Sequence, residues 1–400
     1  MTHCSNSHGI SEPAACRDLP ATARAAPTIL NVQVLRGIAA LLVVYFHLQP
    51  VVHTAYGGNH IWKFGLAGVD IFFVISGFVM FYANRTQPAS ISRFLAARVL
   101  RVMPLYWCAT LLIVGLFAIG LRPNGVHYLD AEIVIKSLFL VKSTFPDGRH
   151  DLVLNLGWTL IFEMFFYVVF AGLLIIKSDK TALSLMAGMF LLTSSFGFLF
   201  RGLGWFDSFV FSTLLIEFLY GAFLGFAYRA YTDRWPSAAI GLALGVTAIA
   251  ALIAIEFSDV PADVLYGHWR FLLLGLPSVM IVASALTFEI DGLACHARLP
   301  LLIGAASYAL YLFHPIFLQA AVKLASALAS VLNSTGASLA AISAAILGAI
   351  LVYIAVDRPL LRLSKRLMRA PLEARKHDER RHVSGGWKRA NALKANTAMH

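Results

Sequence analysis

The sequence predicts an all-α fold, a polytopic membrane bundle of about ten transmembrane helices. Hydrophobic residues make up 59% of the 400-residue chain, charged residues make up 13%, and the mean hydropathy is +0.74. This composition is typical of a polytopic membrane protein and not of a soluble core. Apolar runs of roughly 18 to 23 residues, long enough to cross about 30 Å of hydrocarbon, also recur along the chain.

Ten such runs follow a polar leader. Residues 1–30 contain neither an apolar run nor a basic amino-terminal region, so we interpret them as a disordered cytoplasmic leader and not as a signal peptide. The transmembrane domain extends over residues 31–357, and residues 358–400 form a basic cytoplasmic tail. The predicted spans are 32–51, 66–84, 102–121, 156–176, 182–200, 208–228, 237–256, 270–289, 300–320 and 336–356.

Most of the net charge lies in the tail. The chain carries a net charge of +11, and residues 358–400 hold 12 Lys and Arg against 3 Asp and Glu. The charge therefore indicates a tail that contacts anionic membrane lipids, and it does not indicate nucleic-acid binding. The cysteines lack metal-ligand spacing, so we expect neither zinc nor a disulfide framework from Cys4, Cys16, Cys108 and Cys295.

The basic residues predict the orientation, because Lys and Arg in short loops stay on the cytoplasmic side of a membrane. They collect in alternate loops, at Arg85, Arg93, Arg98, Arg101, Lys177, Lys180, Arg229 and Arg234. Both termini are therefore predicted to be cytoplasmic in the inner (plasma) membrane. Residues 122–155 then form a long outer loop, in which residues 132–141 are predicted to form a short interfacial helix.

Two ionisable residues interrupt the apolar first span. Arg36 and His47 are eleven residues apart, so at about 100° per residue they share one helix face, about 16 Å apart along the axis. On this stretch alone two explanations remain open. Arg36 and His47 form a functional pair, or Arg36 snorkels to one interface while His47 caps the far end.

The topology divides the other ionisable residues into two layers. The outer layer holds His47, Asp70, Glu163 and His314, and the cytoplasmic mouth holds Arg93, Arg98 and Arg101. A histidine beside a carboxylate is a minimal general base, and guanidinium groups bind phosphate oxygens. Acyl transfer from a nucleotide thioester fits this division.

The candidates also have structural explanations. Asp70 is placed to cap its helix, and the arginines are placed to anchor the cytoplasmic side. His314 precedes a proline that leaves a carbonyl near Tyr311 without its helical donor, so a packed kink is an alternative. A structural role is less expected for Glu163, which lies in an aromatic segment without a local cation. Glu217 is a further buried carboxylate for which the sequence names no partner.

Six segments in order carry a resemblance to a known family. They are LRGIAALLVVYFH, GVDIFFVISGFVM, RVLRVMPLYW, WTLIFEMFFY, SYALYLFHP and VDRPL, within a match of about residues 31 to 365. The chain resembles integral-membrane acyltransferase family 3, most closely the branch that decorates exopolysaccharides, O-antigens and lipo-oligosaccharide signals. The resemblance implies acetyl-CoA as donor, no tightly bound cofactor or metal, and transfer to a hydroxyl of a polysaccharide or lipid-linked sugar.

The resemblance also assigns roles to residues of this chain. The catalytic group would comprise His47, Arg36, Asp70 and Glu163, and the donor-binding group Arg98 and Arg101 with the neighbouring Arg93. Support is expected from Ser76, Trp158, Tyr308, Tyr311 and His314. His47 is the predicted base, with Asp70 or Glu163 as the carboxylate that orients it, and His314 remains a rival for the role of base. Asp357 stands where relatives commonly have glutamate, which weakens a role for that position.

Two other classes of function stay open. A secondary transporter or glycan flippase would also bury charges in a bundle, although the sequence shows no internal repeat of the kind that transporter halves have. A non-catalytic member of a polysaccharide-synthesis complex is the other class. The transferred group would be acetyl or another short acyl group such as succinyl.

The predicted topology has a direct test. A cysteine placed at Asp147, in the loop of residues 122–155, is expected to react with a membrane-impermeant thiol reagent in intact cells, because that loop faces outward. A cysteine placed in the tail is expected to react only after permeabilisation. Labelling of the tail in intact cells would reverse the orientation.

Overall fold

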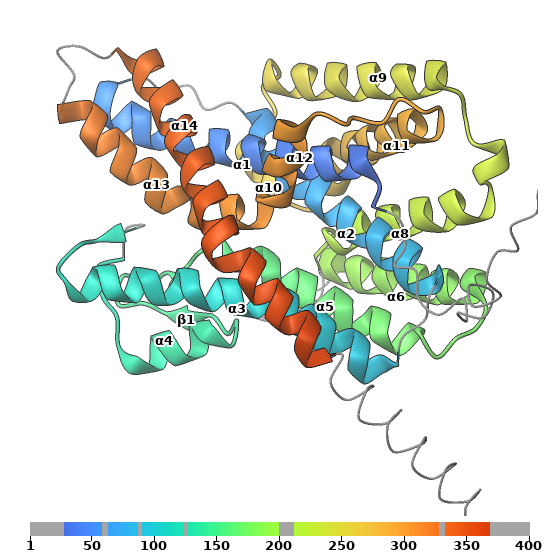
Figure 1. Cartoon of the computed structure of the whole chain (residues 1–400), viewed down its shortest axis with the longest axis horizontal. Coiled ribbons are helices and arrows are strands. Elements are labelled where there is room, and N and C mark those ends of the chain that lie inside the picture. Colours follow the sequence, from blue (N-terminus) through green and yellow to red (C-terminus); the bar gives the residue numbers. More distant parts are fainter. Residues whose placement is uncertain are drawn as a thin grey trace, which may run out of the picture.

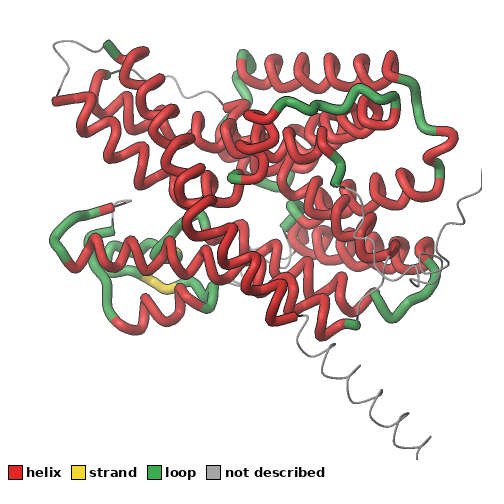
Figure 2. The backbone as a smooth tube through the Cα atoms, in the orientation of Figure 1, coloured by secondary structure: helices red, strands yellow, loops and turns green. Residues whose placement is uncertain are grey.

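The computed structural model describes residues 28–57, 63–86, 90–123, 126–199, 212–327 and 333–368. The predicted disordered leader, up to residue 27, and the tail from residue 369 lie outside the described residues. Within these ranges the chain is almost entirely helical (Figure 2), and the extended segments are the short strands β1 (Ser143–Thr144) and β2 (His150–Asp151). The prediction of an all-α fold is confirmed.

The helices follow the predicted spans in order (Figure 1). They are α1 (Leu30–Tyr56), α2 (Ala67–Thr86), α3 (Ile91–Ala118), α4 (Ala131–Leu138), α5 (Gly157–Leu173), α6 (Asp179–Leu199), α8 (Leu215–Ala230), α9 (Ala238–Glu256), α10 (Ala262–Tyr266), α11 (Leu276–Ile290), α12 (Arg298–Ala305), α13 (Ser307–Ala327) and α14 (Ser334–Val352). Two π-helical turns, η6 (Phe271–Gly275) and η7 (Tyr353–Asp357), lead into α11 and extend α14. Short 3₁₀ turns, η2 (Lys63–Leu66) and η5 (Thr232–Arg234), precede α2 and follow α8.

A membrane bundle is confirmed, but the count of ten spans is not. Each predicted span overlaps a described helix, yet length and hydropathy qualify only six helices among the described residues. A seventh span results if α12 and α13, which meet at 74°, cross the membrane as one broken span. α5 has 17 residues and is shorter than the usual span of about 20.

Polar contacts gather the helix ends that the predicted topology places on one side. Asp179 at the start of α6 accepts from Arg85 at the end of α2 (2.8 Å) and from Arg229 at the end of α8 (2.7 Å). Glu289 near the end of α11 accepts from the first amides of α1, at Leu30 and Asn31, both at 2.8 Å. The contacts agree with the predicted alternation of the helices, and which side faces the cytoplasm stays a prediction.

α2 packs against α8 at very short range. A Cβ atom added to Gly77 of α2 would lie 2.0 Å from the carbonyl oxygen of Phe218, and one added to Gly221 of α8 would lie 1.9 Å from that of Val74. Only glycine permits this approach, and small residues commonly let membrane helices pack backbone to backbone. α2 also contacts α1, α5 and α11, so it holds a central place in the bundle.

The predicted interfacial helix of residues 132–141 is present as α4. The Asp130 side chain caps it by accepting from the amide of Ile133 (2.7 Å). Tyr106 and Trp107 of α3 donate to the carbonyls of Ser137 and Leu138, each at 2.8 Å. α4, in the loop that the sequence predicts to be outside, is therefore packed against α3.

Candidate functional site

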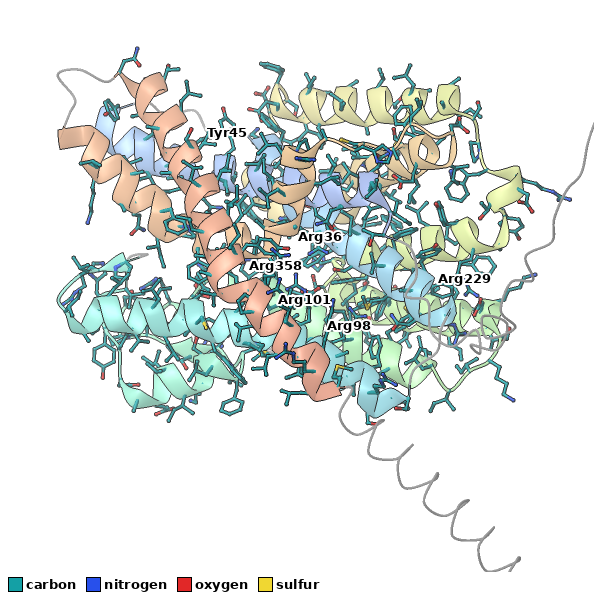
Figure 3. All side chains as sticks on the ribbon, viewed as in Figure 1. Arg36, Tyr45, Arg98, Arg101, Arg229 and Arg358 are labelled. Carbon is teal, nitrogen blue, oxygen red and sulfur yellow. The ribbon has the colours of Figure 1, made fainter. Side chains whose placement is uncertain are left out.

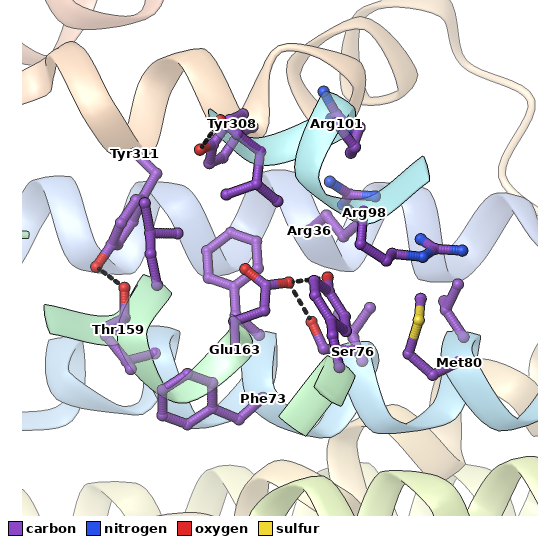
Figure 4. Close-up of a pocket in the computed structure, with 17 residues that line it drawn as sticks. Arg36, Phe73, Ser76, Met80, Arg98, Arg101, Thr159, Glu163, Tyr308 and Tyr311 are labelled. Carbon is purple, nitrogen blue, oxygen red and sulfur yellow. Dashed lines mark hydrogen bonds between the residues drawn. The ribbon is translucent and has the colours of Figure 1, made fainter. Parts of the chain in front are cut away.

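A cavity of about 130 Å³ lies between α1, α2, α3, α5 and α13 (Figure 4). Its walls combine aromatic and aliphatic residues with polar side chains. The polar members are Arg36, Ser76, Arg98, Arg101, Thr159, Glu163, Tyr167, Tyr308 and Tyr311. Figure 3 shows that Arg36, Arg98 and Arg101 gather near the middle of the molecule. The cavity thus collects seven residues that the sequence proposed for the catalytic, donor or supporting groups.

The arginines of α3 are held by aromatic rings. Arg98 and Arg101 are three residues apart, so they face nearly the same direction on the helix. The Arg98 guanidinium carbon lies 5.3 Å from the ring centroid of Phe94 and 5.7 Å from that of Tyr167. That of Arg101 lies 5.3 Å from the Tyr308 centroid. These cation–π contacts orient both side chains and leave most of their hydrogen-bond donors available to a ligand.

Asp357 has a contact that the sequence did not anticipate. The last residue of the π-helical turn η7, it is 1% exposed, and its Oδ1 accepts from Nη1 of Arg101 at 3.1 Å. π-helical turns in α-helices frequently mark functional sites. The replacement of glutamate by aspartate at this position was expected to weaken its role. Asp357 nevertheless helps to place Arg101, one of the predicted donor-binding arginines.

Glu163 lies inside the cavity and not beside His47. Its Oε1 accepts from the Ser76 hydroxyl at 3.1 Å and from the Tyr167 hydroxyl in a short hydrogen bond. The cavity therefore presents three guanidinium groups and one carboxylate. This surplus of positive charge suits an anionic ligand.

The structure brings His47 and His314 together. Their ring centroids are 5.0 Å apart, which agrees with the prediction that both residues lie in the same layer of the membrane domain. Nδ1 of His47 is 2.9 Å from the carbonyl oxygen of Val43, and Nδ1 of His314 is 2.9 Å from that of Tyr311. The Tyr311 carbonyl is the one that Pro315, lacking an amide hydrogen, leaves free.

These contacts define the tautomer of both rings. A carbonyl oxygen accepts hydrogen bonds and never donates them, so Nδ1 carries the hydrogen in each histidine. In the neutral ring Nε2 is then the basic atom. Nε2 of His314 is buried without a hydrogen-bond partner in the described part of the chain.

Tyr311 connects the histidines with the cavity. Neither His47 nor His314 belongs to the cavity wall, whereas Tyr311 does. The Tyr311 and His314 ring centroids are 6.3 Å apart. An arginine-lined cavity therefore ends one aromatic ring away from a pair of histidines.

Asp70 is not brought to His47. It is fully buried and binds Arg270 through both oxygens, Oδ1 to Nε at 2.9 Å and Oδ2 to Nη2 at 2.8 Å. Glu217 lies close enough to Asp70 and Arg270 to interact electrostatically with each of them. Glu217, for which the sequence named no partner, thus has Arg270 as a charged neighbour. Within the described ranges neither Asp70 nor Glu163 hydrogen-bonds to His47. The prediction that one of these carboxylates orients His47 is therefore not reproduced.

Arg270 and Thr159 are the residues that sequence reasoning missed. Arg270 begins the predicted span 270–289 at its outer end, which is also the depth predicted for Asp70. Two opposite charges at the same depth could therefore have predicted this ion pair from the sequence. Thr159 precedes Glu163 by four residues and therefore shares its helix face. In contrast, Arg93 is exposed and Trp158 packs against Phe73 and Phe162, and neither lines the cavity.

Comparisons with known proteins agree on one kind of protein. Residues 29–354 match a family model described as an acyltransferase domain, acyltransferase family 3. The chain is 35% identical to the "Exopolysaccharide production protein ExoZ" of Rhizobium meliloti (strain 1021) over 280 residues, which cover 69% of this chain and 83% of that relative. No solved structure matches the chain.

The Asp70 pair predicts a large effect on stability. Arg270→Leu is expected to lower the free energy of unfolding by about 3 to 5 kcal/mol, because it leaves a buried carboxylate without its partner. Thermal unfolding of the purified protein in detergent measures the change. Replacing both residues by leucine is expected to restore much of the loss. Arg149→Ala, which breaks the exposed pair with Asp147, serves as control with no measurable change. Unaltered unfolding of the Arg270→Leu protein would contradict the prediction.

Proposed function

The chain belongs to acyltransferase family 3, and we propose that it is a membrane O-acyltransferase that moves an acetyl or similarly short acyl group from acyl-CoA to a hydroxyl of an exported polysaccharide. One observation carries the proposal: the arginine-lined cavity ends at Tyr311, whose ring lies next to His314 and its neighbour His47, and both histidines turn Nδ1 to a backbone carbonyl. The donor, the acyl group and the acceptor are parts of this proposal.

The cavity supports an acyl-CoA donor through its charge. Acyl-CoA carries phosphates at one end of a long arm and the thioester at the other. Arg98 and Arg101 would bind phosphate oxygens, for which the planar guanidinium fork is suited. Arg36 adds a third positive charge. Asp357 holds Arg101, and the two carboxylates of Asp357 and Glu163 leave a net positive charge on the three arginines. The thioester would then extend toward Tyr311 and the histidines.

His47 is proposed as the general base. Its Nε2 takes the proton of the acceptor hydroxyl while the hydroxyl oxygen bonds to the thioester carbonyl carbon. The carbon–sulfur bond then breaks, and the thiolate takes up a proton to leave as the CoA thiol. The net reaction exchanges a thioester for an ester and consumes no proton. General base catalysis of this kind contributes about 10² to 10⁴ in rate.

The Val43 carbonyl takes the orienting role that the sequence assigned to a carboxylate. It accepts from Nδ1 of His47 at 2.9 Å and so directs Nε2 away from its own helix. His314 is oriented in the same way and lies close enough to stabilise the proton on its neighbour or to receive it. The two histidines form a pair in this proposal, in which His47 acts on the acceptor hydroxyl and His314 supports it.

An exported polysaccharide is proposed as acceptor because the similar protein is named for exopolysaccharide production. In the predicted topology His47 lies in the outer half of the membrane, on the side where such a polymer emerges. A polysaccharide-synthesis complex and membrane lipids are further proposed partners.

A reconstituted assay tests the function. Lipid nanodiscs that contain the protein leave both faces of the membrane accessible, and they receive isotope-labelled acetyl-CoA and non-acylated polysaccharide from a strain that lacks the gene. Label in the polysaccharide and thiol release that depends on the polymer are expected. A transporter or a non-catalytic subunit would release no thiol and transfer no label, and that result would refute the proposal.

The donor site predicts that arginine cannot be replaced by lysine. Arg98→Lys or Arg101→Lys is expected to raise the KM for acetyl-CoA about tenfold, equivalent to about 1.4 kcal/mol, since lysine keeps the charge but lacks the fork. Arg234→Lys, at an exposed position outside the cavity, is the matched control. An unchanged KM in both cavity variants would assign Arg98 and Arg101 to membrane anchoring.

The base assignment predicts a loss of transfer without a loss of protein. His47→Ala and His47→Gln are expected to lower kcat by about 10² to 10⁴ while abundance and donor binding stay normal. His53→Ala in the same helix controls for the loss of an imidazole. Near-normal transfer by the His47 variants together with loss in His314→Gln would exchange the roles of the two histidines.

A further inference from the structure

We infer that Tyr311, tethered by Thr159, forms the end wall of the donor cavity and limits the length of the acyl group that the protein transfers. This inference rests on the proposed function and adds the acyl chain length to it. Tyr311 is a specificity-determining residue in this role, and Thr159 acts through it as a positioning residue.

The tyrosine ring is fixed at both ends. Its Cα belongs to α13, and its hydroxyl lies 2.7 Å from the Thr159 hydroxyl of α5 and 3.1 Å from the carbonyl oxygen of Leu156, the residue before α5. Thr159 also donates to the Leu156 carbonyl at 3.0 Å. The Tyr311 hydroxyl, the Thr159 hydroxyl and the Leu156 carbonyl oxygen therefore form one hydrogen-bonded cluster, and through it the Tyr311 ring bridges α13 and α5. The side chain is only 6% exposed, so it has little room to turn aside.

This ring stands where two functional regions meet. Figure 4 shows Tyr311 and Thr159 at one end of the cavity, with Arg98 and Arg101 toward the other. Beyond Tyr311 the His314 ring lies at 6.3 Å, and His47 lies 5.0 Å from His314. A donor bound by its phosphates at the arginines must therefore bring its carbonyl carbon to the Tyr311 end. The alkyl part of the acyl group then meets the ring.

The surroundings of Tyr311 leave the wall stiff. Phe72 packs edge-on against it, with centroids 6.0 Å apart, and Phe73 lines the same part of the cavity. Aromatic side chains have few rotatable bonds, so they yield less than aliphatic side chains to added methylene groups. An acetyl group ends before this wall, whereas butyryl carries two more carbons into it. A packed hydrophobic site discriminates by about 10- to 200-fold for each methylene.

The test compares acyl donors of increasing length. Lipid nanodiscs with the full-length protein, in which both faces of the membrane are accessible, receive acetyl-, propionyl- or butyryl-CoA and the non-acylated polysaccharide, and kcat/KM is measured for each donor. The wild type is expected to prefer acetyl over butyryl by at least about tenfold. Tyr311→Ala is expected to lower this ratio at least about tenfold, because the wall is removed.

Two subtler variants isolate the tether. Tyr311→Phe keeps the ring and loses the hydroxyl, and Thr159→Val keeps the volume and loses the same hydrogen bond. Each is expected to lower the acetyl-to-butyryl ratio by a few fold, and the double variant is expected to equal Tyr311→Phe, because Thr159 acts through a Tyr311 hydroxyl that this variant already lacks. Tyr106→Phe removes a buried hydroxyl that binds Ser137 outside the cavity, and its ratio is expected to match the wild type.

The outcomes separate the inference from the proposed function. An unchanged ratio in Tyr311→Ala and Tyr311→Phe, with transfer retained, overturns the inference and leaves the proposed function intact. If Tyr311→Ala does not fold, the ratios of Tyr311→Phe and Thr159→Val decide the matter. A wild-type protein that transfers none of the three acyl groups refutes the proposed function itself.

Discussion

The pairing of buried charges is the constraint on which this bundle depends, because an ion in a medium of low dielectric must find its counter-ion or hydrogen bonds within the protein. Asp70 and Arg270 meet this requirement completely, with both carboxylate oxygens bound. Arg98 and Arg101 meet it in part, through aromatic rings and a single contact with Asp357. The completely paired charges hold helices together, and the partly paired ones face the cavity, where a ligand can complete them.

Backbone packing decides where these charges lie. The close approach of α2 and α8, at Gly77 and Gly221, places α2 in the centre of the bundle. α2 then carries Asp70 to Arg270 and, six residues later, Ser76 to Glu163. Six residues correspond to about 600° of helical turn, which places the two positions about 120° apart around the axis, so one helix serves two different neighbours. A residue larger than glycine at position 77 would separate α2 from α8 and displace both contacts.

Hydropathy and the basic loops predicted the helices, their order and the shared layer of His47 and His314, since these depend on position along each helix. The pairings across helices were not predicted, because depth in the membrane does not determine which way a side chain faces. Asp70 therefore binds Arg270 and not His47. Helix angles would have separated the α3 arginines: Arg93 lies about 140° from Arg98 around the axis, whereas Arg101 lies about 60° from it. Arg93 is accordingly exposed and outside the cavity.

The orientation of both histidines by carbonyl groups also follows from the charge balance of the site. A carboxylate beside His47 would add negative charge near the end of a cavity whose three guanidinium groups would receive a polyanionic donor. The Val43 and Tyr311 carbonyls hold the rings without adding a net charge. The proline after His314 supplies one of these carbonyls by removing its helical donor, so a break in the helix becomes an orienting group for the ring beside it. The carboxylates Asp70 and Asp357 are thereby left to balance arginines, and the positive end of the cavity stays open to an anionic ligand, which in the proposed function is the donor.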